Sequence, residues 1–467
     1  MMNNKMRRGI SMALALAIAA GMSAGCTKKA QDTDAEGRTL ITVGGYPVKE
    51  GTSKDSFDQK IATFEEENPD VKINPDSWIF DLQSFYAKAA GGQLPTIYST
   101  NFTEVEQCIK GGYSADITDV LKKRGYDGML NEKVMDVVTE DGKIYGLPTD
   151  AYLLGMACNI SMFEKAGLME ADGTPMQPKT WDEVAEFAKK IKDATGEAGL
   201  ALCSISNYGG WLITPIMWSY GVKFMEQDAD GKWKATFNTP EAEAALSYVK
   251  DLKWKYDVLP ANTLIDDPEQ SKLFAGDKVG MILSLGGNAG NFAAYDMNPD
   301  NIGYIAFPAG PARHVTLLGG HIVQIDKNAT EAQKDACLRW QELSTNFKAT
   351  DAYKKSIEDS IASKLENGTI VGVNEFSIWS DQAETRQVSE DMIKEKANCN
   401  LNHVKLYNEF IANCPADIQA EEPVCAQELY GILDSCIQEV LTNENADCKA
   451  ILEKANSDFQ SNYLDNI

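Results

Sequence analysis

The sequence predicts an α/β protein with two lobes and a helical C-terminal region. Two observations support this fold class. Short apolar runs typical of strands alternate with amphipathic helical patterns, which implies sheets with helices on both faces. The chain also has 467 residues, 43% of them hydrophobic, and a chain of this length normally divides its apolar residues between more than one core. After about residue 330 the pattern is nearly all helical.

The first elements are marked by β-branched residues and by residues that stop helices. A glycine turn follows the first strand, and the next helix carries Phe57, Ile61 and Phe64 on one face. Asn68-Pro69 ends that helix, and Gly91-Gly92 ends a second helix over residues 82–90. We expect strands over residues 40–43, 71–73 and 95–99.

The next elements follow from helix caps and further apolar runs. Thr180 and Glu183 have the spacing of a capping box, so a helix should begin immediately after Thr180. Thr239-Pro240 should open another helix, because proline favours the first helical position. We expect strands over residues 200–204, 279–283 and 302–307.

The N-terminus is typical of a bacterial export signal. Lys5, Arg7 and Arg8 precede an apolar run over residues 10–20, which ends at Ser23-Ala24-Gly25-Cys26. This motif resembles a lipobox, in which the signal is cut before a cysteine that then carries a lipid. An ordinary secretory signal or an uncleaved helix are the alternatives, although the run is short for a membrane span. We expect residues 1–25 to be a signal peptide, Cys26 to be the lipid attachment site, and residues 26–37 to be a flexible linker.

The charge balance excludes several classes of partner. The formal net charge is −25, and removal of residues 1–25 takes away three positive charges and no negative ones, which leaves −28. Nucleic-acid binders need a basic surface, and an acidic surface is not attracted to anionic lipids. We therefore expect no nucleic-acid partner and contact with the membrane through the lipid anchor alone. No apolar run near 20 residues follows Cys26.

Cysteine and histidine usage favours neither a disulfide framework nor a metal site. Nine of the ten cysteines remain after Cys26, and no two of them have C-x-x-C spacing. Several recur at helical spacing among apolar residues, as Cys425 and Cys436 do, so we expect mostly buried free thiols, with one bridge among the five C-terminal cysteines as an alternative. The three histidines form no ligand cluster with them. We expect no metal and no cofactor.

Several segments, in this order along the chain, resemble those of one known family. They are residues 41–46, the helix end at 64–71, the run 141–148 with Tyr152 and Asn159 after it, the helix start at 180–183, the run 274–281, and the return segment 308–320. By these segments the chain resembles the extracellular solute-binding proteins of carbohydrate ABC importers, which include the maltodextrin-binding proteins. The resemblance covers most of residues 38–467.

The resemblance implies a periplasmic-binding-protein-like fold with a ligand cleft between two lobes. The N-terminal lobe would comprise residues 38–150 and 307–345, and the C-terminal lobe residues 151–306 and 346–467. The chain would cross between the lobes near 148–152, 307–311 and 343–346. The implied partners are a small sugar or oligosaccharide and the permease subunits of an ABC transporter. The protein would act as a lipid-anchored monomer at the extracellular face of the bacterial cytoplasmic membrane, without enzymatic activity.

A sugar site needs flat aromatic surfaces for C–H faces and convergent polar groups for hydroxyls. Loops that follow strands, and the crossing segments, are where such groups can meet. The candidates are Tyr46, Trp78, Phe80, Asp81, Thr100, Asn101, Asp150, Tyr152, Trp211, Trp218, Asn288, His321 and Trp379. Each also has a structural interpretation, above all His321 as a structural hydrogen-bonding residue. Trp181, Trp254 and Trp340 lie on helical stripes and are assigned to structural roles.

One loop departs from the maltodextrin-binding members, and two other functions stay open. Those proteins carry an aromatic loop after the strand at 279–284, whereas this chain has Leu285-Gly-Gly-Asn-Ala-Gly290, so we do not assign maltodextrin. A surface glycoside hydrolase would need two suitably spaced carboxylates, and 69 acidic residues supply such pairs by chance. A peptide receptor of the same architecture is the third hypothesis.

Overall fold

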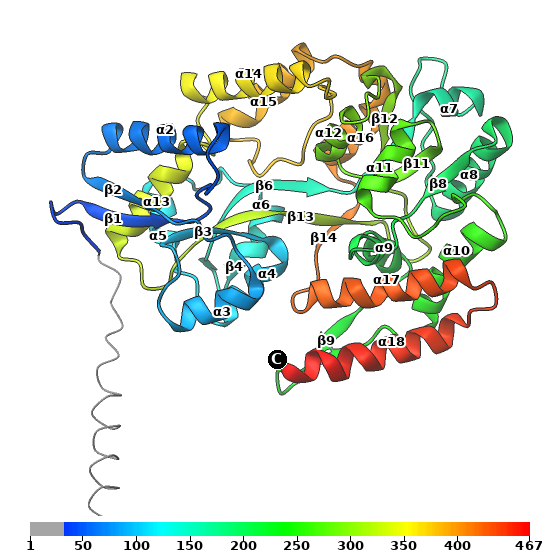
Figure 1. Ribbon diagram of the computed structural model, residues 1–467, viewed down its shortest axis with the longest axis horizontal. Coiled ribbons are helices and arrows are strands. Elements are labelled where there is room, and N and C mark those ends of the chain that lie inside the picture. Colours follow the sequence, from blue (N-terminus) through cyan, green and yellow to red (C-terminus); the bar gives the residue numbers. More distant parts are fainter. Residues whose placement is uncertain (1–31) are drawn as a thin grey trace, which may run out of the picture. The chain divides into compact units, whose positions relative to one another are not determined.

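The computed structural model describes residues 32–467, apart from the side chains of Thr52, Leu82, Gln83 and Ala289. The described chain forms two compact units, one of residues 32–99 with 324–340 and one of residues 100–323 with 341–467 (Figure 1). The chain passes from one unit to the other within β3 (Ile97–Asn101), within β13 (Val315–Ile325) and within α13 (Glu331–Glu342).

The first unit is built on a parallel sheet. Strand β1 (Thr39–Val43) pairs with β2 (Val71–Pro75) along its whole length, and Val43 pairs with Ile97 of β3. Helices α2 (Thr52–Glu67) and α3 (Leu82–Ala90) follow the first two strands, as predicted. Asp81 caps α3 by accepting a hydrogen bond from Ser84 N at 2.9 Å. The buried residues that hold this unit together include Ile41, Phe64, Val71, Ile73 and Phe85.

Local hydrogen bonds form a turn just before the first strand. Thr33 forms a β-bridge with Thr39, and Asp34 accepts hydrogen bonds from the backbone N–H groups of Glu36 and Arg38, each at 2.9 Å. An Asp34–Arg38 ion pair at 2.7 Å closes this turn. This turn lies within residues 26–37, the segment predicted to be a flexible linker, and that assignment stays a prediction. The predicted signal peptide and lipid attachment at Cys26 lie outside the described residues.

The second unit contains a sheet in the order β12-β7-β11-β8. Its strands are β7 (Gly155–Asn159), β8 (Ala198–Ala201), β11 (Val279–Ser284) and β12 (Ile302–Ile305). Nearly every residue of these strands is buried. Helices α7 (Ile160–Lys165), α8 (Trp181–Thr195) and α11 (Asp267–Ala275) contact this sheet. Burial on both faces explains why these strands are continuous small or apolar runs without alternation.

The predicted caps in this unit are confirmed. Helix α8 begins at Trp181, and Thr180 Oγ1 accepts from Glu183 N at 3.3 Å. Helix α10 (Pro240–Trp254) begins at Pro240, with Thr239 as its cap.

A second group of strands runs beside β13. Strand β6 (Leu147–Leu153) pairs antiparallel with β13, and β14 (Asp417–Ala420) pairs parallel with it. We did not predict β14 from the sequence, since the region after residue 330 has an almost wholly helical pattern. The strand has four residues of which only Ile418 is strongly apolar, so its structure depends on pairing with β13 rather than on a local signal.

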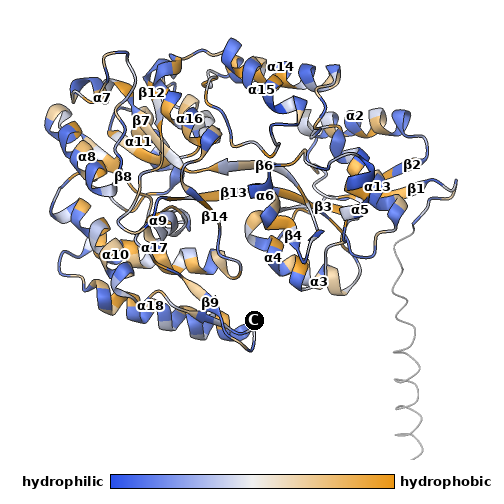
Figure 2. Cartoon of the chain, turned by 180° about the vertical axis from the view of Figure 1, so that it is seen from behind, coloured by the Kyte–Doolittle hydropathy of each residue, from blue (hydrophilic) through white to orange (hydrophobic). Residues whose placement is uncertain are grey.

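The C-terminal region is otherwise helical, as predicted. It contains α14 (Asp351–Glu366), α15 (Glu384–Glu395), α16 (Lys405–Asn413), α17 (Ala426–Thr442) and α18 (Cys448–Asn462). Helix α17 packs against α9 (Tyr208–Ser219), α10 and α18. Figure 2 shows hydrophilic residues along the outer side of α18, the pattern of a helix with one buried face. The remaining elements are α4 (Phe102–Lys110), α5 (Thr118–Lys123), α6 (Glu132–Met135), β4 (Thr139–Glu140), β5 (Lys143–Ile144), β9 (Met225–Gln227), β10 (Trp233–Ala235) and α12 (Ala289–Ala293).

The nine cysteines of the described chain are free thiols, and seven of them are buried. Cys399 and Cys425 are half-buried, and burial raises the pKa of each thiol to about 11. This agrees with the expectation of buried, unpaired cysteines, which behave as small apolar residues.

The two compact units divide the chain differently from the predicted lobes. Residues 100–150 and 307–323, which the sequence assigned to the N-terminal lobe, belong to the same unit as residues 151–306. The pairing of β6 with β13 holds these segments together in one unit. The lobe boundaries at residues 150, 306 and 345 stay a prediction.

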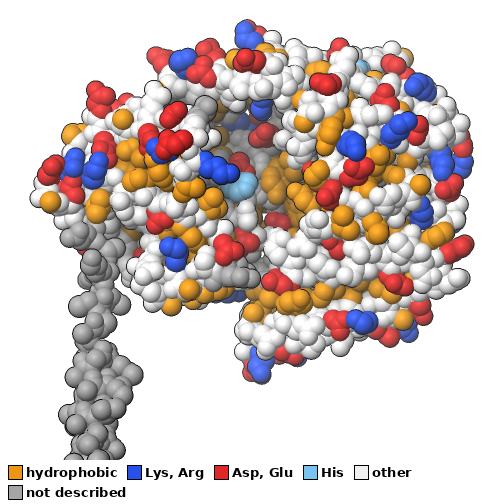
Figure 3. Space-filling model, in the orientation of Figure 1, with side chains coloured by type: hydrophobic (Ala, Val, Ile, Leu, Met, Phe, Trp, Pro, Cys, Tyr) orange, Lys and Arg blue, Asp and Glu red, His pale blue; other side chains and the backbone are white. Residues whose placement is uncertain are grey.

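The surface carries mixed charge. On the face of the described chain shown in Figure 3, acidic and basic side chains are scattered among apolar and uncharged ones, as expected for a solvated exterior. Between residues 32 and 467 no helix combines the length and the apolar character that crossing a bilayer requires.

Candidate functional site

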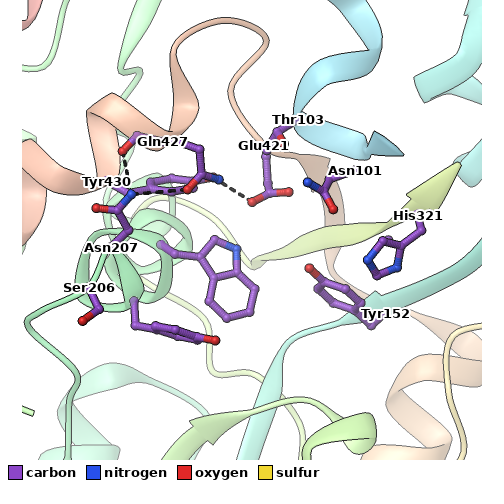
Figure 4. A pocket seen from close by; sticks show the side chains of 12 residues that line it. Asn101, Thr103, Tyr152, Ser206, Asn207, His321, Glu421, Gln427 and Tyr430 are labelled. Carbon is purple, nitrogen blue, oxygen red and sulfur yellow. Dashed lines mark hydrogen bonds between the residues drawn. The ribbon is translucent and has the colours of Figure 1, made fainter. Parts of the chain in front are cut away.

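A cavity of about 310 Å³ lies at the N-terminal end of α9. We call it the Trp211 pocket, and Figure 4 shows the side chains around it. All the residues that line it belong to the second unit. They are Asn101, Thr103, Tyr152, Ser206, Asn207, Tyr208, Trp211, Gly320, His321, Glu421, Gln427 and Tyr430. The volume falls within the range of small-molecule sites.

Three aromatic rings form one wall of the pocket. The Trp211 ring lies 6.2 Å from that of Tyr152 and 6.1 Å from that of Tyr208, with interplanar angles of 85° and 82°. These edge-to-face contacts fix the indole from two sides. Because Trp211 and Tyr208 are only partly buried, they offer apolar surface to a ligand without having to unpack from the core.

The turn before α9 is held in an unusual conformation. Ser206 and Asn207 have φ values of 62° and 66°, a left-handed region that residues other than glycine seldom adopt. The buried carboxylate of Asp434 on α17 holds this turn by accepting hydrogen bonds from Asn207 N and Gly210 N, both at 2.7 Å. Its negative charge also sits favourably at the N-terminus of α9.

Close contact between α9 and α17 requires glycine at two positions. A Cβ atom on Gly210 would lie 2.1 Å from the carbonyl oxygen of Tyr430, and one on Gly209 would lie 2.6 Å from Asp434 Oδ1. The missing side chains therefore bring Asn207 within reach of Gln427, whose carbonyl oxygen accepts from Asn207 Nδ2 at 3.1 Å (Figure 4).

Glu421 places a carboxyl group beside the aromatic wall. It follows β14 directly, and its Oε1 accepts a hydrogen bond from the Tyr430 hydroxyl at 2.8 Å. Burial raises the pKa of Glu421 to about 7, which outweighs the lowering by hydrogen bonds from Tyr430 and Trp211, and the charge of Glu104 raises it further. Near neutral pH this carboxyl can therefore accept or donate a hydrogen bond.

The end of β3 contributes polar groups on another side of the pocket. Asn101 is the N-cap residue of α4, and Thr103 lies in its first turn. The Thr103 hydroxyl donates to Glu104 Oε1 at 2.6 Å. Glu104 is 8% exposed, and its burial raises its pKa.

A histidine–aspartate pair lies where β6 and β13 face each other. His321 Nδ1 is 3.0 Å from both carboxylate oxygens of Asp150, and this hydrogen bond raises the pKa of His321. Two positions along the same strand pair, a Cβ on Gly319 would lie 2.3 Å from the Tyr152 hydroxyl. The glycine thus leaves room for the Tyr152 ring to lie across β13 beside the pocket.

Four of the thirteen predicted ligand residues line the Trp211 pocket, namely Asn101, Tyr152, Trp211 and His321. Asp150 and Trp379 line a second cavity, of about 320 Å³. Thr100 is 3% exposed and does not line the pocket, nor does the half-buried Asn288. Trp218 is 1% exposed, and its indole N–H donates to Glu422 Oε1 at 2.9 Å.

The other four predicted residues belong to the first unit. The Tyr46 hydroxyl donates to Asp58 at 2.9 Å, and the Trp78 indole N–H donates to Ser84 Oγ at 3.0 Å. The Trp78 ring also packs against those of Phe80, Phe85 and Tyr98, while Asp81 caps α3. Their role in ligand binding stays a prediction.

Two of the three tryptophans assigned to structural roles are buried, and the third is partly exposed. Trp181 and Trp340 are 2% and 4% exposed. Trp254 is 38% exposed, and its indole N–H donates to Val440 O at 2.8 Å.

The three pocket residues that come from after residue 415 were not predicted from the sequence. Glu421, Gln427 and Tyr430 follow the unpredicted strand β14, so the sequence offered no reason to place them beside β3 and α9. The one available signal was the pair of adjacent acidic residues, Glu421-Glu422, before Pro423. Among residues 32–467 no group of three or more His, Cys, Asp or Glu side chains could hold a metal ion.

The fold is that of the two-lobed periplasmic binding proteins, as a comparison with solved structures shows. The cyclic alpha-maltosyl-1,6-maltose binding protein from Arthrobacter globiformis matches with a TM-score of 0.64 and 23% identity, over 92% of this chain and 100% of that one. Residues 50–338 match the family of bacterial extracellular solute-binding proteins. The chain belongs to this family, which confirms the resemblance inferred from its motifs.

Two relatives show how far sequence similarity extends. A binding protein of Brucella abortus (strain 2308) is 29% identical over 329 residues, which are 68% of this chain and 75% of that protein. The sn-glycerol-3-phosphate-binding periplasmic protein of Agrobacterium fabrum is 26% identical over 302 residues, which are 62% of this chain and 60% of that protein.

Proposed function

We propose that this extracellular solute-binding protein captures a sugar, specifically an oligosaccharide, in the Trp211 pocket and delivers it to the permease of an ABC transporter. The observation that carries this proposal is the aromatic wall of Trp211, Tyr152 and Tyr208 beside the carboxyl group of Glu421. Aromatic faces suit the C–H surfaces of a sugar, and carboxyl and amide groups suit its hydroxyls. The name of the Arthrobacter globiformis protein supports an oligosaccharide.

The charges around the pocket favour an uncharged sugar over a phosphorylated ligand. None of the described residues that line it is Lys or Arg, whereas phosphate recognition normally uses those side chains. Glu421 and the neighbouring Glu104 would repel an anion. The similarity to a glycerol-3-phosphate-binding protein therefore supports the family assignment. It does not make glycerol 3-phosphate the favoured ligand of this chain.

We further propose that the protein binds its sugar without cleaving it. A hydrolase is the second candidate, because a raised pKa such as that of Glu421 suits a general acid. The mechanism needs a second carboxylate that can reach the substrate. Neither Glu104, which is 8% exposed, nor Asp150, which is hydrogen-bonded to His321, lines the pocket beside Glu421.

The anchoring proposal rests on the motif that ends at Cys26. Cleavage before this cysteine and attachment of a diacylglycerol would hold the protein, as a monomer, at the extracellular face of the cytoplasmic membrane. Mass spectrometry of the membrane-extracted protein should find a lipid-modified Cys26 as the first residue. An unmodified cysteine, or cleavage at another position, contradicts the proposal.

Isothermal titration calorimetry tests the binding proposal. The protein should bind one member of a panel of α- and β-linked oligosaccharides of two to six units with a Kd near or below about 1 μM, roughly −8 kcal/mol. Chromatography of the recovered ligand should find it intact. Release of shorter sugars would identify a hydrolase instead, while binding of glycerol 3-phosphate or peptides but of no sugar would overturn the ligand class.

A further inference from the structure

The turn that leads into α9 carries four of the residues that line the Trp211 pocket. Ser206 and Asn207 form this turn in the left-handed conformation, and Tyr208 and Trp211 lie in the first turn of the helix. Two successive left-handed residues other than glycine are unfavourable unless the surrounding structure holds them. The shape of this side of the pocket therefore depends on the groups that hold the turn.

The cap of α9 is supplied by another helix. The side chain of an N-cap residue usually accepts a hydrogen bond from an N–H group two or three residues further on. Asn207 is the N-cap residue of α9, and its side chain makes no such bond. Asp434 of α17 makes both hydrogen bonds of a capping box instead, because one carboxylate oxygen accepts from Gly210 N and the other from Asn207 N, each at 2.7 Å.

The side chain of Asn207 is therefore free to line the pocket. Its amide donates to the backbone carbonyl oxygen of Gln427 at 3.1 Å and lies 3.3 Å from the side-chain oxygen of that residue. Figure 4 shows both side chains at the pocket. Asp434 is 5% exposed and does not line the pocket. It also lies beyond the residues 50–338 that match the family.

A buried carboxylate is a costly way to cap a helix. Burial raises the pKa of Asp434, and hydrogen bonds from the backbone N–H groups of residues 210, 207 and 209 lower it. An N-cap side chain would satisfy Gly210 N without burying a charge. The buried carboxylate differs from such a cap in that it leaves Asn207 free for the pocket.

We propose that Asp434 is a positioning residue of the sugar site, which caps α9 from α17 and thereby presents Trp211, Tyr208 and the amide of Asn207 to the ligand. This inference rests on the proposed sugar-binding function. It adds that the affinity of the pocket depends on a residue that does not touch the sugar. A wall that is fixed before binding need not be ordered by the ligand, which favours affinity.

A double-mutant cycle tests this role. Asp434→Asn keeps the shape of the side chain but replaces one accepting oxygen with an NH2 group. Calorimetry measures the Kd of the wild type, Asp434→Asn, Trp211→Ala and the double variant for the tightest-binding oligosaccharide of the panel. Asp434→Asn should weaken binding by about tenfold, the scale of coupling within one hydrogen-bond network. In the Trp211→Ala background it should cost less than about threefold, because the ring that it positions is gone.

Glu422→Gln is the matched control. Glu422 is another buried carboxyl in contact with α9, but its partner is the indole N–H of Trp218 rather than the turn. This variant should keep the wild-type Kd. An unchanged Kd in Asp434→Asn, an equal loss with and without Trp211, or the same loss in Glu422→Gln would overturn the positioning role.

Fluorine NMR separates repositioning of the wall from loss of the fold. With 5-fluorotryptophan in place of the eight tryptophans, the Trp211 signal is the one that is missing from Trp211→Ala. In Asp434→Asn this signal should shift or broaden, whereas those of the buried Trp181 and Trp340 should stay. A Trp211 signal that does not change would contradict the proposal.

Hydrogen exchange of the wild type decides the question if Asp434→Asn does not fold. Peptides that cover residues 205–212 should exchange slowly without sugar, and sugar should change their rate little, because the cap is already formed. Fast exchange that slows only with sugar would overturn the proposal. If no oligosaccharide of the panel binds the wild type, the sugar-binding proposal fails, while fast exchange in the free protein would count against Asp434 alone.

Discussion

Two tryptophan–glutamate pairs join α9 to the segment after β14, and they face different surroundings. Trp211 and Glu421 line the open pocket, whereas Trp218 and Glu422 are 1% and 8% exposed in the core. The two tryptophans are seven residues apart on one helix, and the two glutamates are adjacent in sequence. In each pair hydrogen bonding from the indole lowers the pKa of the carboxyl while burial raises it, and the result is about 7 in both.

The comparison shows that residue type and spacing do not by themselves define a binding residue. Trp211 lies at the N-terminal end of α9, where the left-handed turn at residues 206–207 leaves space next to the helix. Trp218 lies two turns further on, where the helix is covered. The first pair is therefore predicted to act in binding and the second in stability.

The largest effect should come from removal of the buried tryptophan. Trp218→Ala should lower the free energy of unfolding by about 3–5 kcal/mol, because it leaves a cavity and takes the indole donor from Glu422. Chemical denaturation measures this loss. Trp254→Ala, which removes a tryptophan that is 38% exposed, should cost clearly less, and equal losses would contradict the account of Trp218 as a core residue.

The buried carboxyl should make stability depend on pH. The pKa of Glu422 is about 7 in the folded chain, whereas that of a solvent-exposed glutamate is 4.5, so between these values the folded protein binds more protons than the unfolded one. The contribution of Glu422 to the free energy of unfolding is thus fully present below pH 4.5 and is lost as the pH rises through 7. The change in the free energy of unfolding caused by Glu422→Gln should therefore be more favourable at pH 8 than at pH 4.5, by about 3 kcal/mol.

Denaturation of the parent and the variant at both pH values measures this difference. Glu444→Gln, at an exposed position after α17, serves as the control. The difference in stability between this variant and the parent should be the same at both pH values. A Glu422→Gln variant whose stability parallels that of the parent at every pH would show that this carboxyl is not buried as described.

Trp211 and Glu421, the pair that lines the pocket, should affect ligand binding rather than stability. Trp211→Ala should weaken binding of the cognate sugar by about 2 kcal/mol, the scale of a central aromatic contact, with little change in the denaturation midpoint. Trp233→Ala is the control, since Trp233 is a partly exposed tryptophan of the same unit that does not line the pocket. Calorimetry that finds Trp211→Ala as tight as the parent would remove Trp211 from the site.

The smallest effect should come from the charge of the open carboxyl. A sugar hydroxyl that donates to Glu421 prefers the ionised form, so binding should tighten as the pH rises through about 7. Glu421→Gln should weaken binding by about 1 kcal/mol at pH 8, the difference between a charged and a neutral acceptor, and should remove most of this dependence. Titrations at pH 6 and pH 8 measure both changes, and an unchanged pH profile in the variant would place the titrating group elsewhere.

Much of the fold could be predicted from local signals. Helix α8 begins after Thr180 because its cap is encoded in four residues, and β11 is recognisable because burial on both faces requires a continuous apolar run. Strand β14 carries no such signal. It forms only because β13 is beside it, and pairing between residues 315 and 417 has no local trace in a single sequence.

The candidate site was predictable to the extent that it follows strands. Asn101 is the last residue of β3 and Trp211 comes after β8, so a rule about strand ends found them. Glu421 and Tyr430 were missed because their position depends on β14 and on the close contact of α17 with Gly209 and Gly210. The same rule also selected Trp218, which shows that position in sequence does not distinguish an open face from a covered one.

The crystal structure of the complex with the tightest-binding sugar tests the central claim most directly. A sugar ring should lie against the indole of Trp211, with a hydroxyl about 2.7–2.9 Å from the carboxyl oxygens of Glu421. A sugar bound elsewhere on the protein, with the Trp211 pocket empty, would contradict the account.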